Sequence, residues 1–262
     1  MFDTHCHLTF DCYDGRIDEV LAAARADGVR GCISISTTTG ELDRLVGVAE
    51  THADVWCSAG VHPLYSDRPI DWDVMGRAAR HPKCVAWGEL GMDRHYAEPP
   101  IELQRRVLEE QLARIEGWTA DGLTKPVVVH CRKAFDDVIP VLEASSLPND
   151  RFVFHCFTGD EADARAVLDF GGSISFTGIV TFANARDVAA ASDLVPDDRI
   201  MVETDAPFLT PEPHRTVRPN EPRYVGCVAA FLAARRGADP AAFERRLDEN
   251  AARFFGIEIP DL

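Results

Sequence analysis

Short runs of hydrophobic residues alternate along the chain with longer segments in which hydrophobic positions recur every three or four residues. The short runs are typical of strands covered on both faces, and the longer segments are typical of amphipathic helices. We expect eight strands, at Phe2–His7, Gly31–Thr37, Val55–Val61, Cys84–Glu89, Pro126–His130, Phe152–His155, Ser173–Phe176 and Ile200–Thr204.

Each interval between two expected strands contains a segment long enough to be the crossover between parallel strands. The expected helices are Arg16–Asp27, Thr39–Thr51, Trp72–Ala79, Ile101–Asp121, Ala134–Glu143, Asp160–Phe170 and Asn184–Asp193. After the eighth strand come a proline-rich loop and two more helices, Arg223–Arg236 and Pro240–Phe255. The alternation predicts an α/β protein with a single domain over residues 1–262, a (β/α)₈ TIM barrel with extra C-terminal helices.

Composition limits the classes of partner. With 43 acidic and 27 basic residues the formal charge is −16, which argues against a protein that coats long nucleic acid with a basic surface. The eight cysteines include no C-x-x-C pair, as expected for reduced, buried thiols of a cytosolic chain. We find no signal-like segment before Phe2 and no membrane-spanning run. We therefore expect a cytoplasmic protein with no membrane contact and no obligate protein partner.

Six candidate metal ligands stand at or near the C-terminal ends of expected strands. His5 and His7 are two residues apart, so they project from the same face of the first strand. Alone, this pair is equally compatible with buried or capping histidines. The other candidates each end or follow a later strand, and the strands of a barrel converge at this end. They are Glu89, His130, His155 and Asp205.

This set of four imidazoles and two carboxylates suits Zn²⁺, Mn²⁺, Fe²⁺ or Co²⁺, and Mg²⁺ less well. Because one tetrahedral zinc does not need six ligands, we expect two divalent metal ions roughly 3.5–4 Å apart, with Glu89 as the bridge. A water bound there has a pKa near 7, and Asp205 would orient or deprotonate it. We therefore assign catalytic roles to Asp205 and Glu89 and expect hydrolysis at phosphorus or at a carbonyl carbon.

Other residues near the expected strand ends are candidates for substrate contact. His62 follows the third strand, and we favour a contact with phosphate over a structural role. Arg132 and its neighbour Lys133 follow His130 and could hold a phosphate, although a surface pair that caps the next helix explains them equally well. Cysteines 6, 131 and 156 alternate with the candidate histidines and should pack between barrel and helices. His95 and His214 are weaker candidates.

Seven sequence blocks, in order along the chain, resemble the TatD family of metal-dependent deoxyribonucleases. They are Asp3–Leu8, Gly60–Pro63, Gly88–Asp93, Val129–Ala134, His155–Gly159, Phe176–Thr181 and Glu203–Leu209. The resemblance implies an amidohydrolase-like barrel that hydrolyses DNA phosphodiester bonds, often from the 3′ end. It also implies that His5, His7 and Asp205 bind one metal and that His130 and His155 bind the other, with Glu89 shared. One departure is Thr216, where the family usually has glycine.

Two other functions stay open. An amidohydrolase or lactonase, or a small-molecule phosphodiesterase, could use the same metal site, although amidohydrolases commonly bridge their metals with a carboxylated lysine where this chain has Glu89. A binding module could retain metal only for folding, but structural zinc sites usually draw on nearby Cys and His residues. Because the surface of the protein is acidic, we expect it to contact only a short part of a DNA substrate, in a single strand or at an end.

Overall fold

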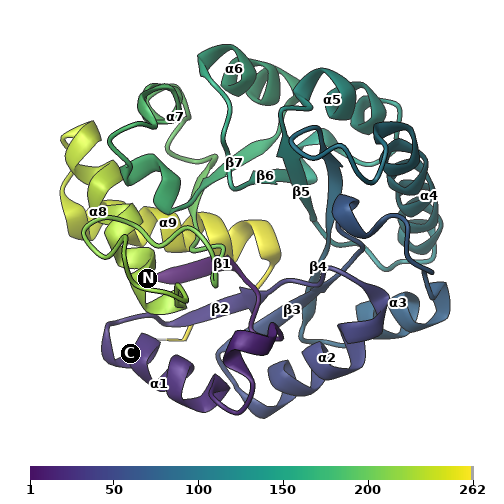
Figure 1. Cartoon of the computed structure of the whole chain (residues 1–262), viewed down its shortest axis with the longest axis horizontal. Helices are drawn as coiled ribbons and strands as arrows, with labels where there is room; N and C mark the ends of the chain where they lie inside the picture. The colour runs from purple at the N-terminus through teal and green to yellow at the C-terminus, as the bar shows by residue number, and fades with distance from the viewer. Residues whose placement is uncertain (261–262) are drawn as a thin grey trace.

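A computed structural model describes residues 1–260 of the chain and contains a barrel of eight parallel strands surrounded by helices (Figure 1). Each strand pairs with the next one along the chain, in the order β1 to β8. This confirms the predicted (β/α)₈ TIM barrel. The strands are β1 Phe2–Cys6, β2 Gly31–Ser34, β3 Val55–Ala59, β4 Cys84–Asp93, β5 Val127–Arg132, β6 Phe152–His155, β7 Ser173–Phe176 and β8 Ile200–Val202.

Helices α1 to α8 form the outer ring of the barrel (Figure 1). Their ends follow local capping chemistry. Asp160 accepts hydrogen bonds from the backbone N–H groups that open α6, and Gly171 closes that helix with φ of 106°. The helices are α1 Ile17–Ala26, α2 Leu42–Thr51, α3 Trp72–Ala79, α4 Ile101–Ala120, α5 Phe135–Glu143, α6 Glu161–Phe170, α7 Arg186–Ser192, α8 Val225–Arg236 and α9 Pro240–Phe255.

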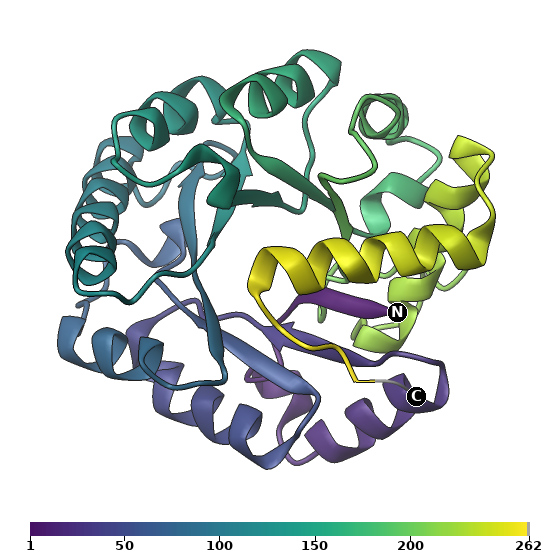
Figure 2. The same ribbon diagram turned by 180° about the vertical axis from the view of Figure 1, so that it is seen from behind.

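Helix α9 lies across the end of the barrel at which the strands begin (Figure 2). Its residue Phe255 packs in one buried cluster with Phe2, Trp56 and Val85, which lie at or near the starts of three strands. The N-terminal end of the barrel is therefore filled with hydrophobic side chains. Within the barrel, room for a site is therefore left at the opposite end, where the strands finish.

The barrel closes between β1 and β8 through loop residues and one buried carboxylate. Asp205 donates its N–H to the carbonyl of His5 (2.9 Å), and His7 donates to the carbonyl of Ala206 (2.7 Å). The carboxylate of Asp3 accepts hydrogen bonds from the backbone N–H (2.9 Å) and the hydroxyl (2.6 Å) of Thr204. These contacts hold the loop after β8 against the end of β1.

Several predicted strand ends were wrong. The first, second, third and eighth strands end earlier than expected, and Asp205, with φ of 51°, turns the chain away after β8. Strand β4 is longer than predicted, because it continues past Glu89 to Asp93. Its pairing with β5 is irregular between Trp87 and Leu90, the segment that contains Glu89. Such an irregularity redirects a side chain without ending the strand.

Within residues 1–260 no helix combines the length and the hydrophobicity needed to cross a bilayer. A cytoplasmic location stays a prediction. The predicted domain of residues 1–262 extends two residues beyond the part of the chain that the structure describes.

Gly60 allows β3 and β4 to approach each other closely, and we expect Gly60→Ala to destabilise the barrel. A Cβ atom at this position would lie 2.4 Å from the Cα atom of Gly88. Because the obstacle is backbone, we expect a loss of about 3 kcal/mol in the free energy of unfolding, measured by urea denaturation. The control is Gly47→Ala in α2, where a Cβ atom would meet nothing within 4 Å. We expect that change to stabilise the protein by about 0.5–1 kcal/mol, and equal effects of the two changes would contradict the packing argument.

Candidate metal centre

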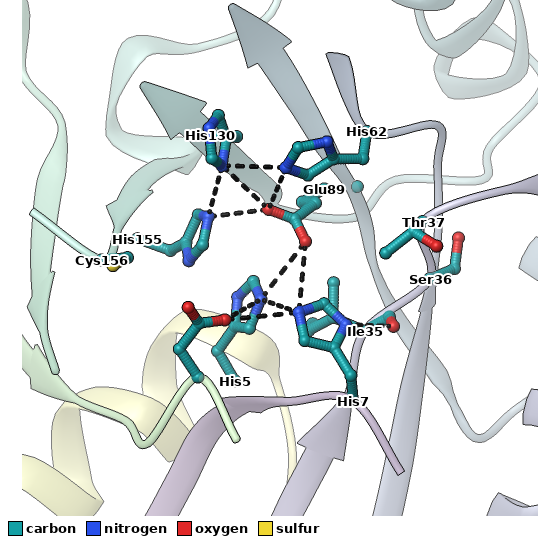
Figure 3. Close-up of polar contacts among 12 residues, drawn as sticks. His5, His7, Ile35, Ser36, Thr37, His62, Glu89, His130, His155 and Cys156 are labelled. Atoms are coloured by element: carbon teal, nitrogen blue, oxygen red, sulfur yellow. Dashed lines mark hydrogen bonds and ion pairs between the residues drawn. The ribbon is translucent and has the colours of Figure 1, made fainter. Parts of the chain in front are cut away.

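The structure brings together the six residues proposed as metal ligands, although up to 200 positions separate them in the sequence. The four histidines among them surround the carboxylate of Glu89 at the end of the barrel where the strands finish (Figure 3). His5 is on β1, and His7 and Asp205 follow β1 and β8. His130 is on β5, and His155 is the last residue of β6. Each strand therefore contributes through its C-terminal part, as the barrel rule requires.

One group of atoms surrounds the Oε1 atom of Glu89. His5 Nε2 and His7 Nε2 each lie 3.5 Å from that oxygen, and 3.6 and 3.3 Å from Asp205 Oδ1. The two nitrogens are 3.3 Å apart. Ligand atoms that each lie about 2.1 Å from a tetrahedral zinc ion are roughly 3.4 Å from one another, which matches these separations. The dimensions of this group therefore fit one metal ion.

A second group surrounds the other oxygen of the same carboxylate. His130 Nδ1 lies 3.3 Å and His155 Nε2 lies 2.7 Å from Glu89 Oε2, and these nitrogens are 3.2 Å apart. Three protein ligands with a further position open to substrate are typical of catalytic zinc sites. Glu89 is thus the one residue that belongs to both groups.

In three histidines, the ring nitrogen that points away from Glu89 lies beside a hydrogen-bond acceptor. His7 Nδ1 lies 3.1 Å from the carbonyl oxygen of Ile35, which can only accept, so this nitrogen carries the proton. His130 Nε2 lies 3.0 Å from Asp93 Oδ2, and His155 Nδ1 lies 3.3 Å from Glu203 Oε1. In their neutral forms, all three rings therefore aim a lone pair at a carboxylate oxygen. Lone pairs in that arrangement repel one another unless a cation lies between them.

The buried carboxylate of Glu89 also requires a positive charge beside it. Its Oε2 atom is buried and accepts no hydrogen bond from residues 1–260, even though His155 Nε2 is 2.7 Å away. Burial raises the pKa of Glu89, but the surrounding histidines, His155 first, outweigh burial and hold the pKa well below its ordinary value. The carboxylate is therefore ionised, and it needs positive charge beside it, from protonated imidazoles or from a metal ion. A divalent cation fits this donor set.

Asp93 and Glu203 were not among the predicted site residues. Asp93 accepts from His130, and Glu203 accepts from His155 and from the backbone N–H of Cys156 (2.6 Å). A carboxylate behind a metal-binding histidine fixes the orientation of the ring and the nitrogen that carries the proton. Strand alternation could have revealed Asp93, since it lies four residues after Glu89 on the same face of β4. Glu203 likewise precedes Asp205 by two residues.

His62 also reaches Glu89, but its hydrogen bonds favour a donor over a metal ligand. Its Nδ1 atom accepts the backbone N–H of Leu64 (3.0 Å), so the proton of the neutral ring is on Nε2. That Nε2 atom lies 3.2 Å from His130 Nδ1 and 3.7 Å from Glu89 Oε2. Burial lowers the pKa of His62 to about 3, so the ring is neutral at physiological pH. It presents one N–H group to the site.

The two groups of atoms open into a cavity of about 320 Å³. Its lining includes His7, His62, His130 and His155, together with Arg132 at the end of β5. Lys133, the other predicted phosphate contact, is exposed and is not part of the lining. The cavity therefore provides an N–H donor and a guanidinium beside the candidate metal ligands.

The family to which this architecture belongs follows from comparison with known proteins. The model of the TatD related DNase family matches residues 2–256. The chain belongs to the TatD family. This membership confirms the resemblance seen in the sequence and the prediction of a metal-dependent hydrolase.

Individual TatD relatives match over their full lengths. The uncharacterized metal-dependent hydrolase YcfH of Escherichia coli is 36% identical over 267 residues, which cover all of this chain and 98% of that protein. The 3′-5′ ssDNA/RNA exonuclease TatD of Klebsiella pneumoniae is 33% identical, with 99% of each chain covered. The crystal structure of the TatD homologue YjjV from Escherichia coli superposes with a TM-score of 0.89 at 26% identity, covering 98% of both chains.

The predictions for three cysteines and two further histidines of this TatD-family chain were partly confirmed. Cys6 and Cys131 pack in the hydrophobic core as expected, although Cys131 also borders the cavity. The prediction for Cys156 was wrong, because this half-buried residue lines the cavity. Its φ of 45° interrupts the strand alternation on which the prediction depended. His95 is exposed, and the ring of His214 lies against that of Tyr224 at a tilt of 32° (4.7 Å between ring centres); neither histidine lines the cavity.

The support that Asp93 gives to His130 leads to a test. We expect Asp93→Ala to lower the affinity for Zn²⁺ by about 10- to 100-fold, the usual loss when a carboxylate behind a ligand histidine is removed. Competition with a chromophoric chelator would measure the affinity. The control is Asp137→Ala, since Asp137 lies near the same end of the barrel but pairs with Arg94. Equal affinities of the two variants would show that Asp93 does not support a ligand.

Metal binding should release protons. Burial lowers the pKa of both His155 and His130, but neighbouring carboxylates outweigh burial and hold both pKa values above the ordinary 6.5. These carboxylates are Glu89 and Glu203 for His155, and Asp93 and Glu89 for His130. At pH 6.5 the metal-free rings are therefore mostly protonated, and Zn²⁺ has to displace these protons. We expect the affinity to fall as the pH falls. Titration calorimetry in two buffers of different ionisation enthalpy would count the protons, and heats that do not depend on the buffer would contradict the argument.

Proposed function

We propose that the protein is a metal-dependent deoxyribonuclease that cleaves DNA phosphodiester bonds, in the manner of a 3′-5′ exonuclease, on a single strand or at an end. The observation that carries the proposal is the pair of ligand groups on the two oxygens of Glu89. Two divalent cations at this site would be held by His5, His7 and Asp205 on one side and by His130 and His155 on the other, with Glu89 common to both. Zn, Mn, Co, Fe and Mg are the candidates.

Metal ions bound there would supply Lewis acidity, which lowers the pKa of water and offsets the charge that develops on phosphate. The protein supplies the remaining groups. Burial raises the pKa of Asp205, but His7, His5 and His155 hold it below the ordinary value, so the carboxylate is ionised. It lines the cavity and can accept a proton from the attacking water. Glu89 acts by fixing the separation of the two ligand groups.

Two groups of the cavity lining suit a phosphate. His62 Nε2–H can donate to a phosphate oxygen, and the Arg132 guanidinium can donate two parallel hydrogen bonds. The charge of Arg132 helps to lower the pKa of Asp93, and its guanidinium is part of the cavity lining. These contacts would orient the phosphodiester against Asp205.

The phosphodiester function is favoured over cleavage of amides or lactones by the residues of β4. No lysine lies between Cys84 and Asp93, so a carboxylated lysine cannot bridge the metals there. A relative of full-length similarity is named a 3′-5′ ssDNA/RNA exonuclease. This name supports a nucleic-acid substrate and the direction of attack that we propose.

Ligand variants test the proposal. With Zn²⁺, Mn²⁺, Co²⁺, Fe²⁺ or Mg²⁺ we expect the protein to release nucleotides from the 3′ end of a 5′-labelled single strand. We expect His130→Ala and Asp205→Asn each to lower kcat by at least about 100-fold, because each removes a ligand and Asp205→Asn also removes the proton acceptor. Gel analysis of the products would report the rate and the direction.

The control for these variants is His81→Ala. His81 pairs with Glu50 at the start of β4, at the other end of the barrel, and it should not affect the rate. Absence of DNA hydrolysis with all five metals would refute the proposal. Turnover of amide or lactone substrates in a parallel screen would then identify the alternative.

A further inference from the structure

Exposed aromatic side chains are rare on this protein and gather at the candidate site. Among residues 1–260, three large hydrophobic side chains are exposed: Tyr96 (51%), Phe208 (49%) and Val217 (38%). Both aromatic members of this set line the cavity, and Val217 does not. Single exposed hydrophobic residues need no explanation, but two aromatic rings at the cavity that holds the candidate metal ligands indicate a binding surface.

Phe208 stands beside the first ligand group. It follows Asp205 by three residues, and its ring centre lies 5.8 Å from that of Phe10 and 6.5 Å from that of His7. The ring of Phe10 in turn stacks on His7 (4.8 Å). Half of the surface of Phe208 nevertheless stays open to solvent. The ring is therefore held in place by its neighbours and presents a free face.

Tyr96 stands beside the second ligand group. It follows Asp93, the partner of His130, by three residues. The guanidinium carbon of Arg132 lies 5.7 Å from the centre of its ring. An exposed aromatic ring thus occurs next to each of the two ligand groups. The second ring also has a cation beside it.

We propose that Phe208 and Tyr96 each stack on a base of a single-stranded nucleic acid, on either side of the phosphate at the metal centre. This inference rests on the function proposed above. A strand presents planar bases alternating with phosphates, which matches two aromatic rings separated by a phosphate-binding centre. Bases in a duplex are already stacked on one another, so the rings select single strands or frayed ends.

The charge of the protein explains why stacking is needed. A formal charge of −16 repels the backbone of a nucleic acid, so long-range attraction cannot hold the strand. Stacking on aromatic side chains needs no charge on the protein and accepts every base, because each base has a π face. The two rings therefore provide affinity without a basic surface and without selecting a sequence.

Binding to the metal-free protein tests the inference without depending on turnover. The probes are a fluorescein-labelled oligothymidylate of eight nucleotides and the same strand with abasic sites, compared by fluorescence anisotropy after chelation. We expect Phe208→Ala and Tyr96→Ala each to weaken binding of the oligothymidylate by about 5- to 100-fold, the range for loss of one stacked base. We expect Phe208→Trp to retain tight binding and Phe208→Leu, which is apolar but not aromatic, to lose it.

The preference for the base-containing strand over the abasic strand distinguishes stacking from a general effect. It should fall in the alanine variants and stay at the wild-type value in Val217→Ala, the matched exposed residue outside the cavity. A strand containing 2-aminopurine should lose fluorescence on binding to the wild type and recover it in the alanine variants. Circular dichroism would establish that the variants are folded.

Unchanged affinity in Phe208→Ala and Tyr96→Ala, or an equal loss for both strands, would overturn the inference. Hydrolysis of thymidine 5′-p-nitrophenyl phosphate by the metal-loaded wild type separates the two proposals. If the wild type hydrolyses this ester while the variants bind like wild type, stacking is refuted and the phosphodiesterase function stands. If the wild type neither hydrolyses phosphodiesters nor binds the oligothymidylate, both proposals are refuted.

Discussion

The site depends on the repulsion between lone pairs that the fold forces together. Three imidazoles are held from behind by Ile35, Asp93 and Glu203, so that their free nitrogens face the carboxylates of Glu89 and Asp205. Buried polar groups that face one another without a proton or an ion between them are strongly unfavourable. The arrangement is therefore stable only with positive charge in it. Protons supply this charge in the metal-free protein, and a metal can replace them.

The barrel makes this arrangement possible because each group comes from a different strand or strand end. The seam between β1 and β8 matters most, since it joins His5 and His7 to Asp205 through backbone hydrogen bonds and the buried Asp3 carboxylate. Helix α9 fills the opposite end of the barrel with hydrophobic side chains. The candidate metal ligands and their cavity thereby lie at one end of the barrel.

The sequence predicted most of this architecture. Its hydrophobic periodicity was sufficient to predict the eight strands and nine helices of the described residues in the right order. It could do so because each strand is buried on both faces and each helix on one. The six candidate ligands could be selected because strand ends of a parallel barrel meet at one end, whatever their separation along the chain. The types of the candidate ligands indicated borderline divalent metals, and the negative net charge indicated that a nucleic acid would be contacted only near the site.

The sequence by itself thus determined the order of the elements and the chemical identity of the groups at the barrel mouth, because both follow from residue type and spacing. Only the tertiary structure decided which atoms face one another. The extension of β4 to Asp93, the left-handed backbone at Cys156 and the hydrogen bond from Leu64 to His62 depend on neighbouring strands and loops. These details fix which nitrogen carries a proton, and distances between residues remote in sequence are not encoded in any local pattern.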